Sequence, residues 1–294
     1  MNILAQPTAA LTLDRESLAR DIRALPSLPP VVLQLMDLLQ QSDAGLDEFA
    51  DTLRLDQALS VKVLQLANSP FYGLSGRILS VRDAIHVLGL RQLSTLVIAA
   101  ALTLQFEALH GRSLHMRAFW RHSIACAVAA RQLALQRGWN DAAAFTAGLL
   151  HDVGRLVVDS HYPEQAAEII AWADQQDISH SEAEHALTGI DHTELGHWVC
   201  EHWRFSTHIC RAIADHHKPP ADGPATLADV VHVADALAHA LDIAGLDNEA
   251  VPPLSTTAWQ RLGLVEPALL PLLRTIEEEF RHLETVLSPV KEAP

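Results

Sequence analysis

Apolar residues recur at helical spacing along most of this chain, and no other feature constrains its fold as strongly. The spacing i, i+3, i+4, i+7 places side chains on one face of an α-helix. Two stripes of this kind consist of Val32, Leu35, Met36 and Leu39, and of Leu59, Val63, Leu66 and Ala67. Ala and Leu dominate over β-branched residues and only 5% of residues are aromatic, a composition that suits helices better than sheets. The sequence therefore predicts an all-α protein.

Turn-forming and capping residues divide the stripes into short helices. Residues 25–30, with three prolines, interrupt the chain before the first stripe, and residues 68–70 end the second. Gly89 is expected to end a helix, and the last helix is expected over residues 276–287. The expected helix N-caps are Asp56, Ser80, Asp141, Ser181, Asp191 and Ser206.

Three segments follow from this pattern. An N-terminal helical lobe is expected over residues 14–110, a second helical lobe over residues 111–245, and a C-terminal helical extension over residues 246–294. The boundary between the two lobes is placed at residues 110–113, a polar stretch that contains glycine.

Charge and cysteine usage limit the surroundings in which the chain works. With 21 basic and 36 acidic side chains, the formal charge is -15, which argues against nucleic-acid or anionic-membrane partners. The longest apolar run, residues 93–106, is too short to span a bilayer, and no signal sequence is recognisable. Cys126, Cys200 and Cys210 form no CxxC pair and lie within apolar helical patterns. We therefore expect a cytoplasmic protein with buried, reduced thiols.

His151 and Asp152 stand side by side within an apolar helical stretch, which is the strongest local sign of chemistry. Burying two ionisable groups requires compensation. A divalent metal provides it, because neutral imidazole and ionised carboxylate both bind transition metals. A hydrogen-bonded pair in the core is the alternative interpretation of this dipeptide.

Further ionisable residues lie on inward-facing positions of other predicted helices. Asp235 falls on an apolar stripe, where an unpaired carboxylate would be costly. The remaining candidates on inward or helix-terminal positions are His122, His192, His216 and His217. Six other histidines are interpreted as ordinary polar or helix-packing residues: His185, His197, His202, His208, His232 and His239.

Taken in chain order, these candidates resemble a known ligand series. The series His122, His151, Asp152, His192, His216, His217 and Asp235 is similar to the metal-ligand order of the HD phosphohydrolase superfamily. The N-terminal half narrows the choice, because residues 25–29 (LPSLP), 66–73 (LANSPFYG) and 84–89 (AIHVLG) resemble the HDOD family. The resemblance covers roughly residues 18 to 240.

The resemblance implies an HD-domain-like helical lobe packed with an N-terminal helical lobe. It implies a regulatory or output module of bacterial signal transduction that acts by contact with a signalling partner, such as a separate response regulator or sensor. HDOD members commonly lack some metal ligands, whereas this chain keeps the series. The expected cofactor is therefore one or two divalent ions of iron, manganese, nickel or zinc.

An enzyme is the alternative function. In a metal-dependent phosphohydrolase or cyclic-dinucleotide phosphodiesterase, Asp152 would bridge ions as a catalytic residue. Arg155 would clamp a phosphate, unless it lies outside the cluster in a surface ion pair. Arg155 stands where the related HD-GYP phosphodiesterases carry Lys, and residues 218–220 replace their Gly-Tyr-Pro signature. These departures weigh against cleavage of cyclic dinucleotides.

Overall fold

The structure is a computed structural model that describes residues 13–25, 27–40, 45–68, 78–106, 115–245 and 251–287. Within these ranges the regular elements are all α-helices, as the sequence predicts, and none is both long and apolar enough to cross a membrane. The helices are α1 (Arg15–Ala24), α2 (Pro30–Gln40), α3 (Leu46–Leu53), α4 (Gln57–Ala67), α5 (Val81–Leu88), α6 (Leu90–Phe106), α7 (Met116–Gln136), α8 (Asp141–Leu150), α9 (Val153–His161), α10 (Pro163–Gln176), α11 (His180–Thr188), α12 (His192–His202), α13 (Thr207–Asp215), α14 (Leu227–Ala240), α15 (Thr256–Arg261) and α16 (Glu266–Leu287).

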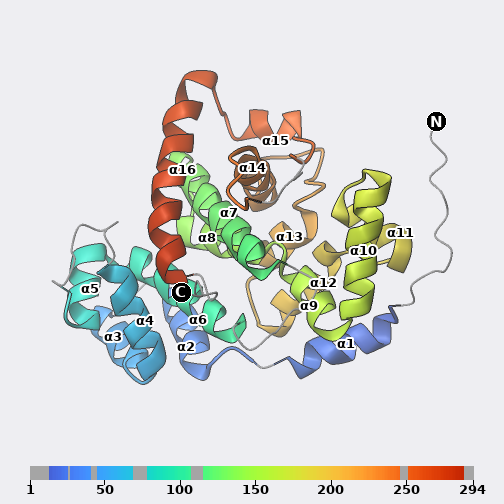
Figure 1. Cartoon of the computed structure of the whole chain (residues 1–294). Helices are drawn as coiled ribbons and strands as arrows, with labels where there is room; N and C mark the ends of the chain where they lie inside the picture. The colour runs from blue at the N-terminus through green and yellow to red at the C-terminus, as the bar shows by residue number, and fades with distance from the viewer. Residues whose placement is uncertain are drawn as a thin grey trace.

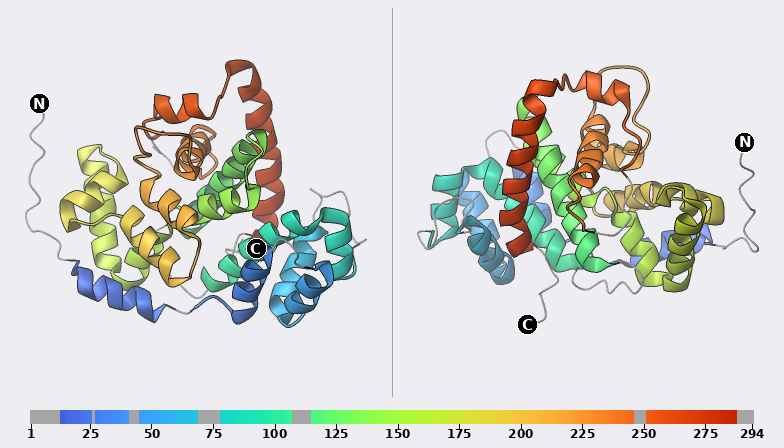
Figure 2. Two further views of the ribbon diagram at one scale, coloured as in Figure 1. Left: turned by 180° about the vertical axis from the view of Figure 1, so that it is seen from behind. Right: turned by 45° about the horizontal axis from the view of Figure 1, so that its top comes forward.

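Helices α2 to α6 pack on one another to form the N-terminal lobe, which lies at one end of the molecule (Figure 1). The second lobe is built around α7, which packs against α8 and α14. Residues 110–113, where the sequence places the boundary between the lobes, lie outside the described residues. Helix α1 lies within the range that the sequence assigns to the first lobe, but it packs on α12 of the second lobe, as two further views also show (Figure 2).

Several helix starts are set by local capping, as expected. Asp56, Ser80 and Asp191 occupy the N-cap positions of α4, α5 and α12, and their side chains accept backbone N–H bonds from the first turn. Ser206 stands at the N-cap of α13 but makes no side-chain capping bond. Gly89 ends α5 with φ of 79°, in the left-handed region that suits glycine.

Two predicted N-caps are wrong by one or two residues. Asn140, not Asp141, caps α8, because Asp141 is 3% exposed and faces Arg131 inside the protein. Helix α11 begins after Ser179 instead of Ser181, through a capping box in which Ser179 and Glu182 bond reciprocally.

The C-terminal helix also begins earlier than predicted. Helix α16 starts at Glu266 and continues through Pro271, which costs one helical hydrogen bond. The helix continues because it buries the apolar stripe Leu272, Ile276, Phe280 and Leu283 against the rest of the protein. Full burial of each such side chain contributes about 1.5–3 kcal/mol, which offsets the lost bond.

A buried ionic network fastens α16 to α7. Arg131 of α7 lies 3.1 Å from a Glu279 carboxylate oxygen and 3.5 Å from Asp141 of α8. Gln132 donates a further bond of 2.7 Å to Glu279, and Arg121 of α7 pairs with Glu284, five residues after Glu279 on α16. Helix α16 also contacts α4 and α6, so it spans from the second lobe to the first.

The network predicts an unequal response of two acidic residues on α16. Glu279 is 6% exposed, so Glu279→Ala leaves the buried Arg131 without its nearer carboxylate. We expect a loss of about 3 kcal/mol in the free energy of unfolding. The control Glu277→Ala removes an exposed pair with Arg281 and should cost less than about 0.5 kcal/mol. Urea denaturation measures both, and equal losses would contradict the assigned role of Glu279.

Candidate metal centre

The seven ionisable residues singled out in the sequence converge in the second lobe, mostly from helix ends. His151 and Asp152 form the junction between α8 and α9, and His192 is the first residue of α12. His216 and His217 follow α13, while His122 and Asp235 project from the middle of α7 and α14. Six of the seven are buried, with exposed fractions from 0% to 5%, and His217 is partly buried.

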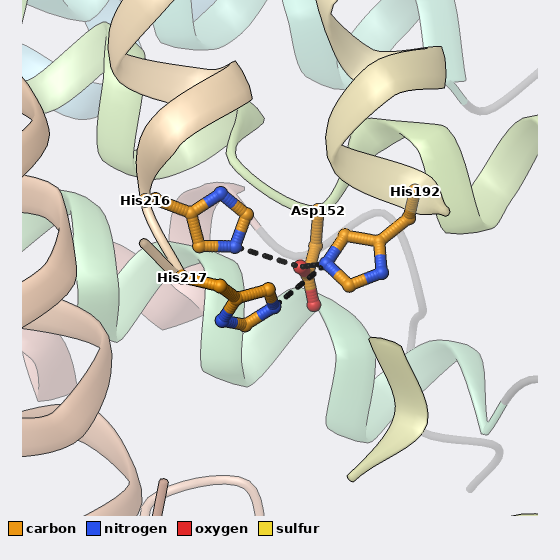
Figure 3. A group of neighbouring side chains, drawn as sticks. All are labelled: Asp152, His192, His216 and His217. Carbon is orange, nitrogen blue, oxygen red and sulfur yellow. Dashed lines mark hydrogen bonds and ion pairs between the residues drawn. The ribbon is translucent and has the colours of Figure 1, made fainter. Parts of the chain in front are cut away.

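Asp152 lies at the centre of one side of the cluster. Its Oδ1 atom is 3.2 Å from His192 Nε2, 3.5 Å from His151 Nε2 and 3.8 Å from His216 Nε2. His217 Nε2 lies 3.0 Å from His192 Nε2. The rings of His192, His216 and His217 surround the Asp152 carboxylate (Figure 3). Asp152, His192, His216 and His217 thus offer four ligand atoms within 4.8 Å of one another.

Asp235 lies at the centre of the other side. Its Oδ1 atom is 3.0 Å from His122 Nε2 and 3.7 Å from His151 Nε2. The Nε2 atoms of His122 and His151 are 3.2 Å apart, so His122, His151 and Asp152 form a second close group. The two sides of the cluster meet at His151 and Asp152.

Backbone hydrogen bonds orient two of the imidazoles for metal binding. His151 Nδ1 donates to the Gly148 carbonyl at 2.7 Å, and His216 Nδ1 donates to the Ile213 carbonyl at 2.7 Å. Because Nδ1 carries the hydrogen, each ring turns the lone pair of Nε2 toward Asp152. His216 Nε2 is buried and has no hydrogen-bond partner among the described residues. A lone pair facing a carboxylate at this distance is repelled unless a cation lies between them, so these residues fit a metal ion.

The electrostatics of the cluster keep most ligands in the state that binds metal. Burial lowers the pKa of His216 to about 4 and that of His217 to about 3, so both rings are neutral at pH 7. Burial opposes ionisation of Asp152 and Asp235, but the surrounding histidines outweigh it and hold both carboxyl pKa values well below the usual range. Burial also disfavours charged His192, yet the Glu184 and Asp152 carboxylates raise its pKa to about 10.

Glu184, which is absent from the ligand series predicted from the sequence, belongs to the site through its contacts with His192. It is 3% exposed and accepts bonds from the backbone N–H of His192 at 2.7 Å and from His192 Nδ1 at 2.6 Å. His180 Nε2 lies 3.3 Å from the same carboxylate. A carboxylate on the second nitrogen of a ligating histidine orients the ring and makes it more basic.

Two further residues lie against the cluster. Arg155 does not lie in a surface pair outside the cluster, because its guanidinium is 3.0 Å from Asp152 Oδ2. His239, interpreted from the sequence as an ordinary packing residue, places Nε2 3.3 Å from Asp235 Oδ1. The signal that could have found His239 is its spacing, since residues i and i+4 share one face of a helix.

Gly154 allows α9 and α12 to approach closely enough to bring Asp152 to His192, because a Cβ atom there would lie 2.1 Å from the His192 carbonyl oxygen. A Cβ atom at Gly196 of α12 would lie 2.9 Å from the Ile213 side chain, so this glycine serves the approach of α12 to α13. Any side chain at Gly154 would force the two helices apart. The glycine two residues after Asp152 is therefore required by backbone contact.

Comparison with known proteins gives consistent matches. A family model described as the HDOD domain matches residues 25–219. An HDOD domain protein of unknown function from Geobacter sulfurreducens gives a TM-score of 0.78 at 28% identity, over 93% of this chain and 98% of that chain. A candidate phosphohydrolase from Shewanella amazonensis SB2B gives a TM-score of 0.75 at 26% identity, over 92% and 98%. An uncharacterized protein from Treponema pallidum (strain Nichols) is 26% identical over 210 residues, which are 69% of this chain but 40% of that protein. The chain thus matches less than half the length of that relative.

The contact at Gly154 predicts a coupled loss of stability and metal binding. Gly154→Ala should destabilise the protein by roughly 1–3 kcal/mol, because overpacking shifts the backbone, and should weaken metal binding by moving His192. Gly45→Ala is the control, since its Cβ would meet nothing nearer than 4.0 Å. Thermal unfolding and elemental analysis measure both effects. An alanine variant of Gly154 with unchanged metal content would contradict this role.

The bond from Glu184 predicts that metal affinity depends on a residue that does not touch the ion. Glu184→Gln should weaken metal binding 10- to 100-fold, roughly the effect of losing such a partner. The matched control is Glu201→Gln on α12, which removes the charge from an exposed pair with His197, away from the cluster. Competition with a chelator measures both affinities. Equal affinities for the two variants would leave Glu184 without the assigned effect.

Proposed function

The chain belongs to the HDOD family, and from this we propose that it is a bacterial signal-transduction module whose second lobe is held in one arrangement by bound metal. A partner protein would recognise that arrangement. The partner we propose is a separate response regulator or sensor. The ions would be one or two divalent cations from iron, manganese, nickel and zinc, which His and Asp ligands accommodate.

The observation that carries this proposal is the enclosure of the Asp152 group. Asp152, His192, His216 and His217 supply four ligand atoms, three of the side chains are buried and the fourth is partly buried. Structural zinc sites are closed by four protein ligands, whereas catalytic sites keep one position open for water or substrate. These ligands come from the starts of α9 and α12 and the end of α13, so one ion would tie three helices together.

The N-terminal lobe supports the proposed contact with a partner. Leu55 and Leu79, at the starts of α4 and α5, are 77% and 81% exposed, and Val61 and Val87 are about half exposed. A partner that covered these side chains would remove apolar surface from water, which stabilises association. The charge of -15 disfavours nucleic acid, and three buried free thiols fit a cytoplasmic, reducing location.

A metal-dependent phosphohydrolase is the second candidate, and Arg155 favours it. Its guanidinium beside Asp152 is 26% exposed, so it could reach a phosphate at the edge of the cluster. The similarity to the candidate phosphohydrolase from Shewanella amazonensis is in line with this function. A bound divalent ion would polarise a phosphoryl oxygen of the substrate and lower the pKa of a bound water. Asp152 would hold the ion, and Arg155 would bind the phosphate.

Metal content and catalytic turnover, measured together, separate the two functions. We expect the purified protein to contain stoichiometric metal and to lose thermal stability when a chelator removes it, because binding to the folded state alone stabilises that state. His151→Ala should lose both the metal and this stabilisation, while the exposed His208→Ala should keep both. A screen with bis(p-nitrophenyl) phosphate should show no turnover. Metal-dependent turnover that His151→Ala abolishes would favour the hydrolase, and a metal-free protein would overturn both.

A further inference from the structure

His239 lies on α14 one turn after Asp235 and faces the same side of the cluster. Its Nε2 atom is 3.3 Å from Asp235 Oδ1, and its ring centroid is 4.4 Å from that of His122. His122, Asp235 and His239 offer ligand atoms within 4.8 Å of one another. The side chain of His239 is 18% exposed, so it lies between the buried ligands and the surface.

The atoms around Asp235 satisfy one another poorly by hydrogen bonds alone. Three imidazole nitrogens, from His122, His239 and His151, lie 3.0, 3.3 and 3.7 Å from the single oxygen Oδ1. His151 Nε2 has no hydrogen to donate, because Nδ1 donates to the Gly148 carbonyl. His122 can donate only one hydrogen from Nε2, either to Asp235 or to His151. When His122 and His239 both donate to Asp235, the lone pair of His151 Nε2 is left without a donor in this group.

A cation among these atoms would satisfy all of them. Ligands about 2.0–2.1 Å from a four-coordinate ion lie roughly 3.3 Å from one another, as follows from tetrahedral geometry. The three distances to Asp235 Oδ1 and the separation of 3.2 Å between His122 and His151 bracket this value. These four separations thus match a shared ion, with Asp235 Oδ1 as the atom common to three of them.

We propose that His239 is a metal ligand that completes a four-ligand group with His122, His151 and Asp235. This inference rests on the proposed metal-holding function and deepens it. With His239 in place, the Asp235 side of the centre is closed by protein ligands, as the Asp152 side is. Two closed positions leave no place for a reacting water, which is the state of a structural centre.

The competing role for His239 is that of a hydrogen-bond donor that only orients Asp235. His239→Gln distinguishes the two roles, because the glutamine amide can donate to Asp235 but is a poor ligand for transition metals. His239→Ala removes both functions, and His239→Cys supplies a new ligand. His208→Ala, on the exposed face of α13, controls for the loss of a histidine.

The experiment titrates Co²⁺ into the metal-free full chain and records visible absorption together with the number of ions bound. We expect two ions in the wild type and in His208→Ala. In His239→Gln and His239→Ala, one ion should bind as before. The other should bind about 100-fold more weakly, or its visible absorption should weaken because added water raises the coordination number of the cobalt. His239→Cys should recover tight binding and add a thiolate-to-cobalt absorption band.

The outcomes separate this inference from the function on which it rests. A wild-type protein that binds no Co²⁺ would overturn both. If the wild type binds Co²⁺ and His239→Gln binds every ion with unchanged affinity and spectrum, only the role of His239 is overturned, and the proposed module stands. Circular dichroism of each variant checks that the helical fold is retained.

Discussion

Two ionised carboxylates in the interior, those of Asp152 and Asp235, place the main constraint on the second lobe. A charge buried without compensation costs several kcal/mol, so the helices around these residues must supply partners. They supply histidines on every side, yet at least two of these rings turn lone pairs toward the carboxylates. Hydrogen bonds among the described residues leave His216 Nε2 without a partner, and the cations that we propose would satisfy it. The metal that we propose would thus stabilise the fold of the second lobe.

The short helices give this centre its shape. His151 ends α8, Asp152 precedes α9, His192 begins α12 and His216 ends α13, so ligands meet where helices start and stop. Side chains at helix ends are positioned by caps and by close backbone contact. Asp191 caps α12 and sets the place of His192, while Gly154 lets the backbone of α9 lie against it. A small error at either position moves a ligand relative to the ion.

The terminal helices connect this centre to the rest of the molecule. Arg15 of α1 forms a bidentate pair with Glu194, two residues after His192, at 2.6 and 2.9 Å. Tyr162, between α9 and α10, donates a hydrogen bond of 2.6 Å to Asp21 of α1. At the other end of the chain, α16 joins α7 to α4 and α6. These contacts join α12 and the α9–α10 junction to α1, whose chain continues into the N-terminal lobe (Figures 1 and 2).

Local sequence determined the class of fold, most helix starts and the candidate ligand series, because helical periodicity and caps are short-range properties and buried ionisable residues stand out against apolar stripes. Only the tertiary structure decided between alternatives of equal local merit. The pattern Ser-x-x-Glu occurs at Ser179 and at Ser181, and the burial of Glu184 against His192 selects the first. Pro271 predicts a break in the last helix, and the packing of α16 overrides it. The i+4 spacing from Asp235 could have marked His239 as a candidate, but only the packing of α14 against α7 shows that His122 lies beside it, because the sequence of α14 does not say which residues of α7 face it.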